Sequence, residues 1–186
     1  MKALIQYHNR IVAAFVLLFL LALPAAAQTA RLDELFAQLL TADEEESQTI
    51  EQEIWIEWSK SGSPAMDLLL ERGRQAMYDG YPEVAIEHLT ALVDHAPDFA
   101  EGWNARATAY YETGDFGPAI SDIGHVLTLN PRHFGALSGL GVIFEDLGRP
   151  EQAMEVYKAA LAINPHAPGL QDAVDRIESD LRGQDL

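Results

Sequence analysis

The sequence contains no cysteine, which excludes disulfide bonds, a thiol nucleophile and any metal site with cysteine ligands. Basic residues are scarce too: 12 lysines and arginines stand against 29 aspartates and glutamates, and the formal net charge is −17. So acidic a surface repels the phosphates of nucleic acids and the headgroups of anionic lipids. We therefore expect the fold to depend on packing alone and nucleic acid not to be a partner.

Motifs of catalytic and cofactor sites are also missing. There is no G-x-S-x-G elbow, no Walker loop and no G-x-G-x-x-G after a strand. The histidines are not paired at a zinc-binding spacing such as H-E-x-x-H, and the acidic residues 43–47 lack the alternating oxygen ligands of a calcium loop. We expect no enzyme activity, no bound metal and no small-molecule cofactor.

One long hydrophobic run occurs, and it lies at the N-terminus. Lys2 and Arg10 give a positive start, residues 11–23 are apolar and uncharged, and "PAAAQ" follows. This pattern predicts a signal peptide over residues 1–27, with cleavage after Ala27 and a periplasmic or secreted protein. An uncleaved membrane anchor is the alternative, although the run barely reaches the roughly 20 residues that span a bilayer.

The rest of the chain repeats itself every 34 residues. The interval holds for prolines, glycines and alanines: Pro97, Pro131 and Pro165; Gly80, Gly114 and Gly148; Ala85, Ala119 and Ala153. A fixed period of this length is typical of repeat architectures. The units are residues 66–99, 100–133 and 134–167.

Each unit reads as two helices joined by a turn. Apolar and small residues recur at spacings of three and four, which places them on one helix face. A glycine-containing turn separates the halves ("DGYPE", "GDFGP", "LGRPE"), and the second half stops before proline ("DHAP", "TLNP", "AINP"). The sequence therefore predicts an all-α protein.

This pattern resembles the tetratricopeptide repeat, W-x2-L-G-x2-Y, then A-x3-F, then P. The residues that carry the resemblance are Trp103, Ala107, Tyr110, Ala119, Ile123 and Pro131 in the second repeat, and Leu137, Leu140, Gly141, Phe144, Ala153, Tyr157 and Pro165 in the third. The resemblance implies a right-handed solenoid of about three helix-turn-helix repeats over residues 65–167. In the first repeat, Arg72 and Ala76 replace the usual leucine and aromatic residue, so its first helix is expected to have different neighbours.

The flanks are expected to be helical caps, because a terminal repeat otherwise exposes its apolar face. Residues 28–64 are predicted to form an N-terminal helical hairpin and residues 168–186 a C-terminal capping helix. The apolar residues at helical spacing are Leu32, Leu35, Phe36 and Leu39, then Ile50, Ile54, Trp55 and Trp58, and finally Leu170, Val174, Ile177 and Leu181.

In a tetratricopeptide array, residues beside the packing stripe of each first helix line a concave groove. The resemblance therefore implies eight candidate protein-binding residues: Leu70, Arg74, Met77, Tyr78, Asn104, Thr108, Tyr111 and Val142. The carboxylate clamp of chaperone-binding family members is not carried over, because Leu70, Ala105, Gly135 and Gly139 occupy most of its positions. Trp103 is expected to be a well-buried packing residue, whose truncation costs about 3–5 kcal/mol.

The leading hypothesis is a non-catalytic adaptor or scaffold of the bacterial cell envelope that holds a peptide or helix of another protein in this groove. A membrane-anchored structural subunit of an envelope complex, with an uncleaved N-terminal helix, is the alternative. A regulatory domain for a separate enzyme also fits the sequence. In each case the N-terminal or C-terminal helix can cover the groove and leave a self-contained bundle.

Overall fold

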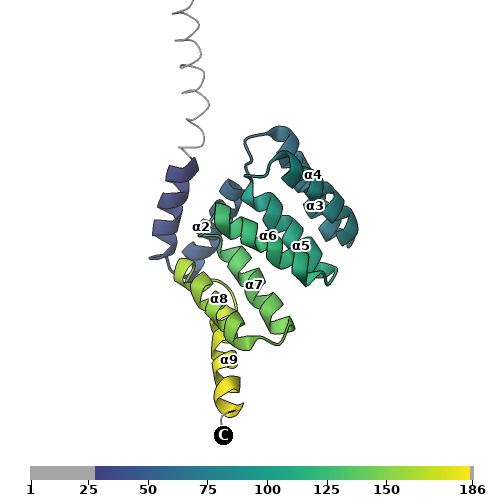
Figure 1. The fold of residues 1–186 in the computed structure, drawn as a ribbon. Helices are drawn as coiled ribbons and strands as arrows, with labels where there is room; N and C mark the ends of the chain where they lie inside the picture. Colours follow the sequence, from purple (N-terminus) through teal and green to yellow (C-terminus); the bar gives the residue numbers. More distant parts are fainter. Residues whose placement is uncertain (1–27, 185–186) are drawn as a thin grey trace, which may run out of the picture.

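The described part of the chain, residues 28–184 of a computed structural model, consists of nine helices and contains no strand (Figure 1). The prediction of an all-α solenoid is thereby confirmed. The predicted signal peptide, residues 1–27, lies outside the described residues. The helices are residues 28–39, α2 (Glu44–Trp58), α3 (Pro64–Tyr78), α4 (Pro82–His95), α5 (Ala100–Glu112), α6 (Phe116–Leu129), α7 (Phe134–Asp146), α8 (Pro150–Ile163) and α9 (Leu170–Gln184).

Three tight turns pair α3 with α4, α5 with α6 and α7 with α8. Gly80, Gly114 and Gly148 have φ values of 80°, 78° and 66°, a left-handed conformation that glycine adopts without steric cost. After each glycine, the next backbone N–H donates to a carbonyl in the last turn of the preceding helix, as from Tyr81 to Ala76 at 2.8 Å. The period of 34 residues is therefore a period of helical hairpins.

The outer face of α3 explains why the first repeat departs from the residue pattern of the tetratricopeptide repeat. Gly102 of α5 lies against α4, where an added Cβ would be 3.1 Å from the Leu92 side chain. The equivalent position in α3 is Leu68, which is 50% exposed, and Arg72 and Gln75 on the same helix are exposed as well. The first repeat thus ends the solenoid with a largely polar surface.

The N-terminal hairpin does not cap that end. Phe36, Ile54 and Trp58 belong to one buried cluster with Phe134 of α7 and Val174 of α9, whereas the apolar cluster of the first repeat contains no hairpin residue. Helix 28–39 accordingly lies on the side of α8, away from α3 and α4 (Figure 1). The expectation of an N-terminal cap is corrected: the hairpin packs where the third repeat offers apolar partners.

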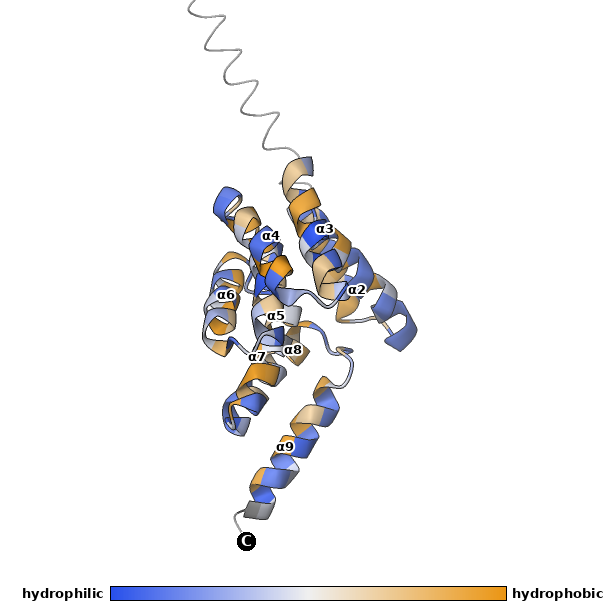
Figure 2. Cartoon of the chain, turned by 90° about the vertical axis from the view of Figure 1, so that its right-hand side faces the viewer, coloured by the Kyte–Doolittle hydropathy of each residue, from blue (hydrophilic) through white to orange (hydrophobic). Residues whose placement is uncertain are grey.

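The C-terminal helix closes the other end of the solenoid. Leu170, Val174 and Ile177 are buried in the same cluster as the hairpin and α8. The remaining residues of α9 are mostly hydrophilic, so the helix shows alternating hydropathy (Figure 2). Such an amphipathic helix covers an apolar face on one side and presents charge to solvent on the other.

Candidate functional site

Helix α2 lies against the concave face of the solenoid at the start of α7. An added Cβ at Gly135 would lie 2.5 Å from Cη2 of Trp55, so the indole ring packs against bare backbone. The neighbouring Trp58 stacks on His133 with 4.1 Å between ring centroids and 15° between planes, and its ring lies 5.1 Å from that of Phe134. The hairpin therefore fills the part of the groove where α7 begins.

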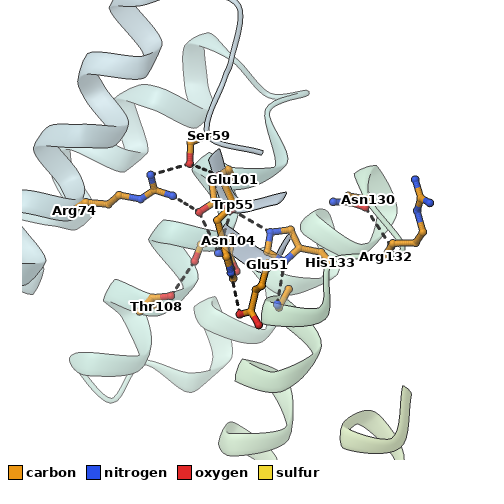
Figure 3. A network of polar contacts seen from close by, with 11 residues as sticks. Glu51, Trp55, Ser59, Arg74, Glu101, Asn104, Thr108, Asn130, Arg132 and His133 are labelled. Carbon is orange, nitrogen blue, oxygen red and sulfur yellow. Dashed lines mark hydrogen bonds and ion pairs between the residues drawn. The ribbon is translucent and has the colours of Figure 1, made fainter. Parts of the chain in front are cut away.

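Beneath α2, a buried carboxylate links the first repeat to the residue that caps α7. Glu101, in the first turn of α5, is 3% exposed and accepts a hydrogen bond from Arg74 of α3 at 2.5 Å. It also pairs with Nε2 of His133 at 3.0 Å, while Nδ1 of that ring accepts the backbone N–H of Ala136 at 3.1 Å. Because Nδ1 is an acceptor, Nε2 carries the proton and donates to Glu101 (Figure 3).

Two further contacts fix the position of α2. The Arg74 guanidinium donates to the hydroxyl of Ser59, directly after α2, at 3.0 Å. At the other side, the buried Asn164 amide donates to Glu51 at 3.0 Å, across 113 residues of sequence. Charged and amide partners at these distances are specific, because misplacement would leave buried polar atoms without hydrogen bonds.

The rest of the groove is open between α5 and α7. A cavity of about 220 Å³ lies there, with an apolar floor that includes Ala107, Ile123 and Ile143. Gly139 contributes depth, since an added Cβ there would meet no atom within 4 Å. The remaining lining residues are Asn104, Thr108, Tyr111, Glu112, Gly135, Ala136 and Val142.

Acidic residues lie in the last turns of α5 and α7, at the Tyr111 end of this cavity. The Tyr111 hydroxyl donates to Asp146 at 2.9 Å, and this hydrogen bond raises the pKa of the phenol. Glu145 accepts from the Tyr157 hydroxyl at 2.9 Å and pairs with Arg176 at 2.6 Å. Burial, followed by the Glu145 hydrogen bond, raises the pKa of Tyr157, so this tyrosine remains a protonated donor.

Four of the predicted binding residues line the open cavity, namely Asn104, Thr108, Tyr111 and Val142. Arg74 instead lines a second cavity of about 640 Å³ between α2 and α3, together with Trp55, Ile56 and Lys60. Whether these residues bind a partner stays a prediction.

The other predicted residues lie elsewhere. Leu70 is 2% exposed and packs with Leu89 in the first repeat, so the expectation that it faces the groove is wrong. Met77 is partly buried against the same cluster, and Tyr78 is 87% exposed at the end of α3 but lines neither cavity. The N-terminal hairpin was one of the two segments expected to be able to cover the groove, and α2 covers the part of it at Gly135. The sequence did not predict which residues of α2 make this contact.

The remaining features of residues 28–184 concern metal ligands, membrane-spanning helices and one further cavity. No group of three or more histidine, aspartate or glutamate residues is placed there to hold a metal ion. Among the same residues, no helix has the length and apolar content needed to cross a bilayer. A third cavity, of about 740 Å³, lies between helix 28–39 and the loops that join the repeats, with a mixed polar and apolar lining.

Comparison with solved structures shows that the fold is similar to that of TPR domains. The first TPR domain of Spaghetti, bound to the HSP90 peptide SRMEEVD, is 26% identical with a TM-score of 0.60, covering 63% of this chain and 93% of that domain. The Sgt2 TPR domain from Aspergillus fumigatus gives a TM-score of 0.62 at 22% identity, covering 66% of this chain and 83% of that one. Both share the solenoid architecture.

Comparison with known protein sequences also finds tetratricopeptide repeat proteins. A TPR repeat-containing protein of Rhizobium etli is 36% identical over 154 residues, or 82% of this chain and 76% of that protein. The small glutamine-rich tetratricopeptide repeat-containing protein 2 of Saccharomyces cerevisiae is 28% identical over 119 residues, or 64% of this chain and 34% of that protein. The family model for the tetratricopeptide repeat matches residues 70–124 and 105–168. The chain therefore belongs to the tetratricopeptide repeat family.

Proposed function

We propose that the chain is a non-catalytic protein-interaction module that holds a segment of another protein in the open part of its concave groove. The observation that carries this proposal is the cavity between α5 and α7, where Gly139 leaves room above an apolar floor. Pockets of this kind, with few polar groups at the rim, are typical binding sites. The peptide held by the related Spaghetti domain supports the same class of function.

The hairpin limits where a partner can enter. Trp55 and Trp58 occupy the groove at Gly135 and His133, and Trp58 is only 7% exposed. Removing them from the groove would expose two large aromatic side chains to water, which is costly. The hairpin is thus a fixed boundary of the groove. A partner reaches the groove where α2 leaves α5 and α7 uncovered.

Site-specific photo-crosslinking in the native host tests this proposal. A photoreactive residue in place of Val142 is expected to capture a discrete set of proteins, because this side chain lines the cavity and is 38% exposed. In the same protein, Gly139→Leu should reduce that capture about tenfold or more, since loss of a well-filled anchor pocket costs about 1.4 kcal/mol or more.

Gly124→Leu provides the matched control. Gly124 also lies in a helix, α6, and an added Cβ there meets no atom within 4 Å, but the residue is not part of the groove. This variant should leave the captured proteins unchanged. If Gly139→Leu captures the same proteins at the same yield as Gly124→Leu, the groove is not the binding site.

We also propose that the module works in the bacterial cell envelope. The signal peptide pattern of residues 1–27 supports an exported protein. The absence of cysteine favours a bacterial envelope over a eukaryotic secretory route, where small exported domains often rely on disulfides. A membrane-anchored structural subunit is the alternative if the apolar residues 11–23 are retained.

N-terminal sequencing of the protein purified from its host separates the two. Cleavage after Ala27 predicts a chain that starts at Gln28. A membrane-bound chain that still contains residues 11–23 would instead establish the anchored form and rule out a released adaptor.

A further inference from the structure

We propose that the cavity between α5 and α7 takes one apolar side chain from a partner segment that carries lysine or arginine beside it. The inference rests on the proposed function and adds the chemistry of the partner. Three features of the described residues support it: the size of the cavity, the direction of the two helices, and the charges at the edge.

The cavity fits a single side chain. Its volume of about 220 Å³ is below the roughly 300–1,000 Å³ of pockets that take drug-sized ligands. The floor is made of Ala107, Ile123, Ala136 and Ile143, which offer no hydrogen-bonding side chain. An aliphatic or aromatic anchor therefore gains more there than a polar one.

The two helices bring their negative ends to the same edge. The hydrogen bond of 2.9 Å from Tyr111 to Asp146 places the last turn of α5 beside the last turn of α7. Each helix end carries a partial charge of about −0.5, and neither last turn contains a basic residue. This edge consequently attracts a cation.

Side chains at the edge add to the same field. Glu112 lines the cavity and is exposed, and Asp146 is exposed beside it. Arg176 is engaged with Glu145, and Arg74 is engaged with Glu101. With a formal net charge of −17 on the chain, the field around the cavity favours a basic partner over an acidic one.

Selection from a phage-displayed random decapeptide library on the purified protein tests the inference. The peptides enriched are expected to carry a large apolar residue with lysine or arginine within two or three positions. Their affinity should fall about tenfold or more in Gly139→Leu, which fills the cavity, and not in Gly124→Leu. Binding should also weaken as salt is raised, because the edge charges are exposed to solvent.

Two double variants that remove the same charge separate the effect of the charges at the cavity edge from the effect of the net charge of the chain. Glu112→Gln with Asp146→Asn should weaken the selected peptides about three- to tenfold, as expected for two exposed charge pairs. Glu83→Gln with Glu87→Gln removes the same charge from exposed positions of α4 and should change affinity less than twofold.

Three outcomes would overturn the inference. Enriched apolar peptides that lose affinity in Gly139→Leu but show no basic preference would refute the cationic partner and leave the proposed function standing. Basic peptides that bind Gly139→Leu as well as the unmodified protein would show general attraction to an acidic chain. If no peptide is enriched in a way that depends on Gly139, the proposed function fails as well.

Discussion

Replacing Trp58 by alanine is expected to lower the free energy of unfolding by about 3–5 kcal/mol, the usual cost of removing a buried tryptophan. The indole ring stacks on His133 and lies 6.0 Å from the ring of Phe36 and 5.1 Å from that of Phe134. Trp58 thus joins the N-terminal hairpin to the third repeat. Equilibrium denaturation followed by circular dichroism measures the loss.

The same substitution at Trp103 shows whether the loss of stability at Trp58 reflects the burial of its side chain. The sequence predicts a well-buried packing residue there, but the side chain is half-buried, stacks on the exposed His125 at 4.3 Å and lies under the guanidinium of Arg106 at 4.9 Å. Trp103→Ala should therefore cost only about 1–2 kcal/mol, less than full burial of a large side chain gains. A loss at Trp103 equal to that at Trp58 would contradict this description of the core.

Local rules account for the parts of the fold that the sequence predicted. The left-handed glycines at 80, 114 and 148 and the fully buried alanines at 85, 119 and 153 each act within one helical hairpin, so their spacing alone reveals the repeat. The candidate groove residues of α5 and α7 came from the resemblance to the tetratricopeptide repeat. Asn104, Thr108 and Val142 lie at the cavity, as that resemblance implies.

The position of the hairpin could not be predicted in this way. It depends on contacts between residues far apart in sequence, such as Glu51 with Asn164, and periodicity carries no information about them. Glu101 shows the same difficulty. From sequence alone, an acidic residue on the groove side of α5 is expected to be exposed to solvent. Its burial is explained only by its contacts with Arg74 and His133. Leu70 is the opposite case: it was expected to face the groove, but it is buried in one cluster with Ala76 and Leu89.

The placement of α2 in the groove has a consequence for Gly135. An alanine Cβ at this position would lie 2.5 Å from Cη2 and 2.7 Å from Cζ2 of Trp55, so the indole would have to move. Gly135→Ala is therefore expected to destabilise the protein by about 1–3 kcal/mol, the range for overpacked sites. In a Trp55→Ala background the clash is absent, and the same substitution should stabilise α7 by up to about 1 kcal/mol.

Gly139 supplies the matched control one turn later in α7. An added Cβ there meets no atom within 4 Å, so Gly139→Ala should be stabilising in both backgrounds, by up to about 1 kcal/mol. Any general effect of a glycine replacement in this helix is thereby separated from the contact with Trp55.

The double-mutant cycle of Gly135→Ala and Trp55→Ala, measured by equilibrium denaturation, tests most directly whether the hairpin occupies the groove. If α2 lies against α7 as described, Gly135→Ala destabilises the protein when Trp55 is present and stabilises it when Trp55 is alanine. If Gly135→Ala stabilises the protein in both backgrounds, as Gly139→Ala does, Trp55 does not lie on Gly135 and the groove is not filled by the hairpin.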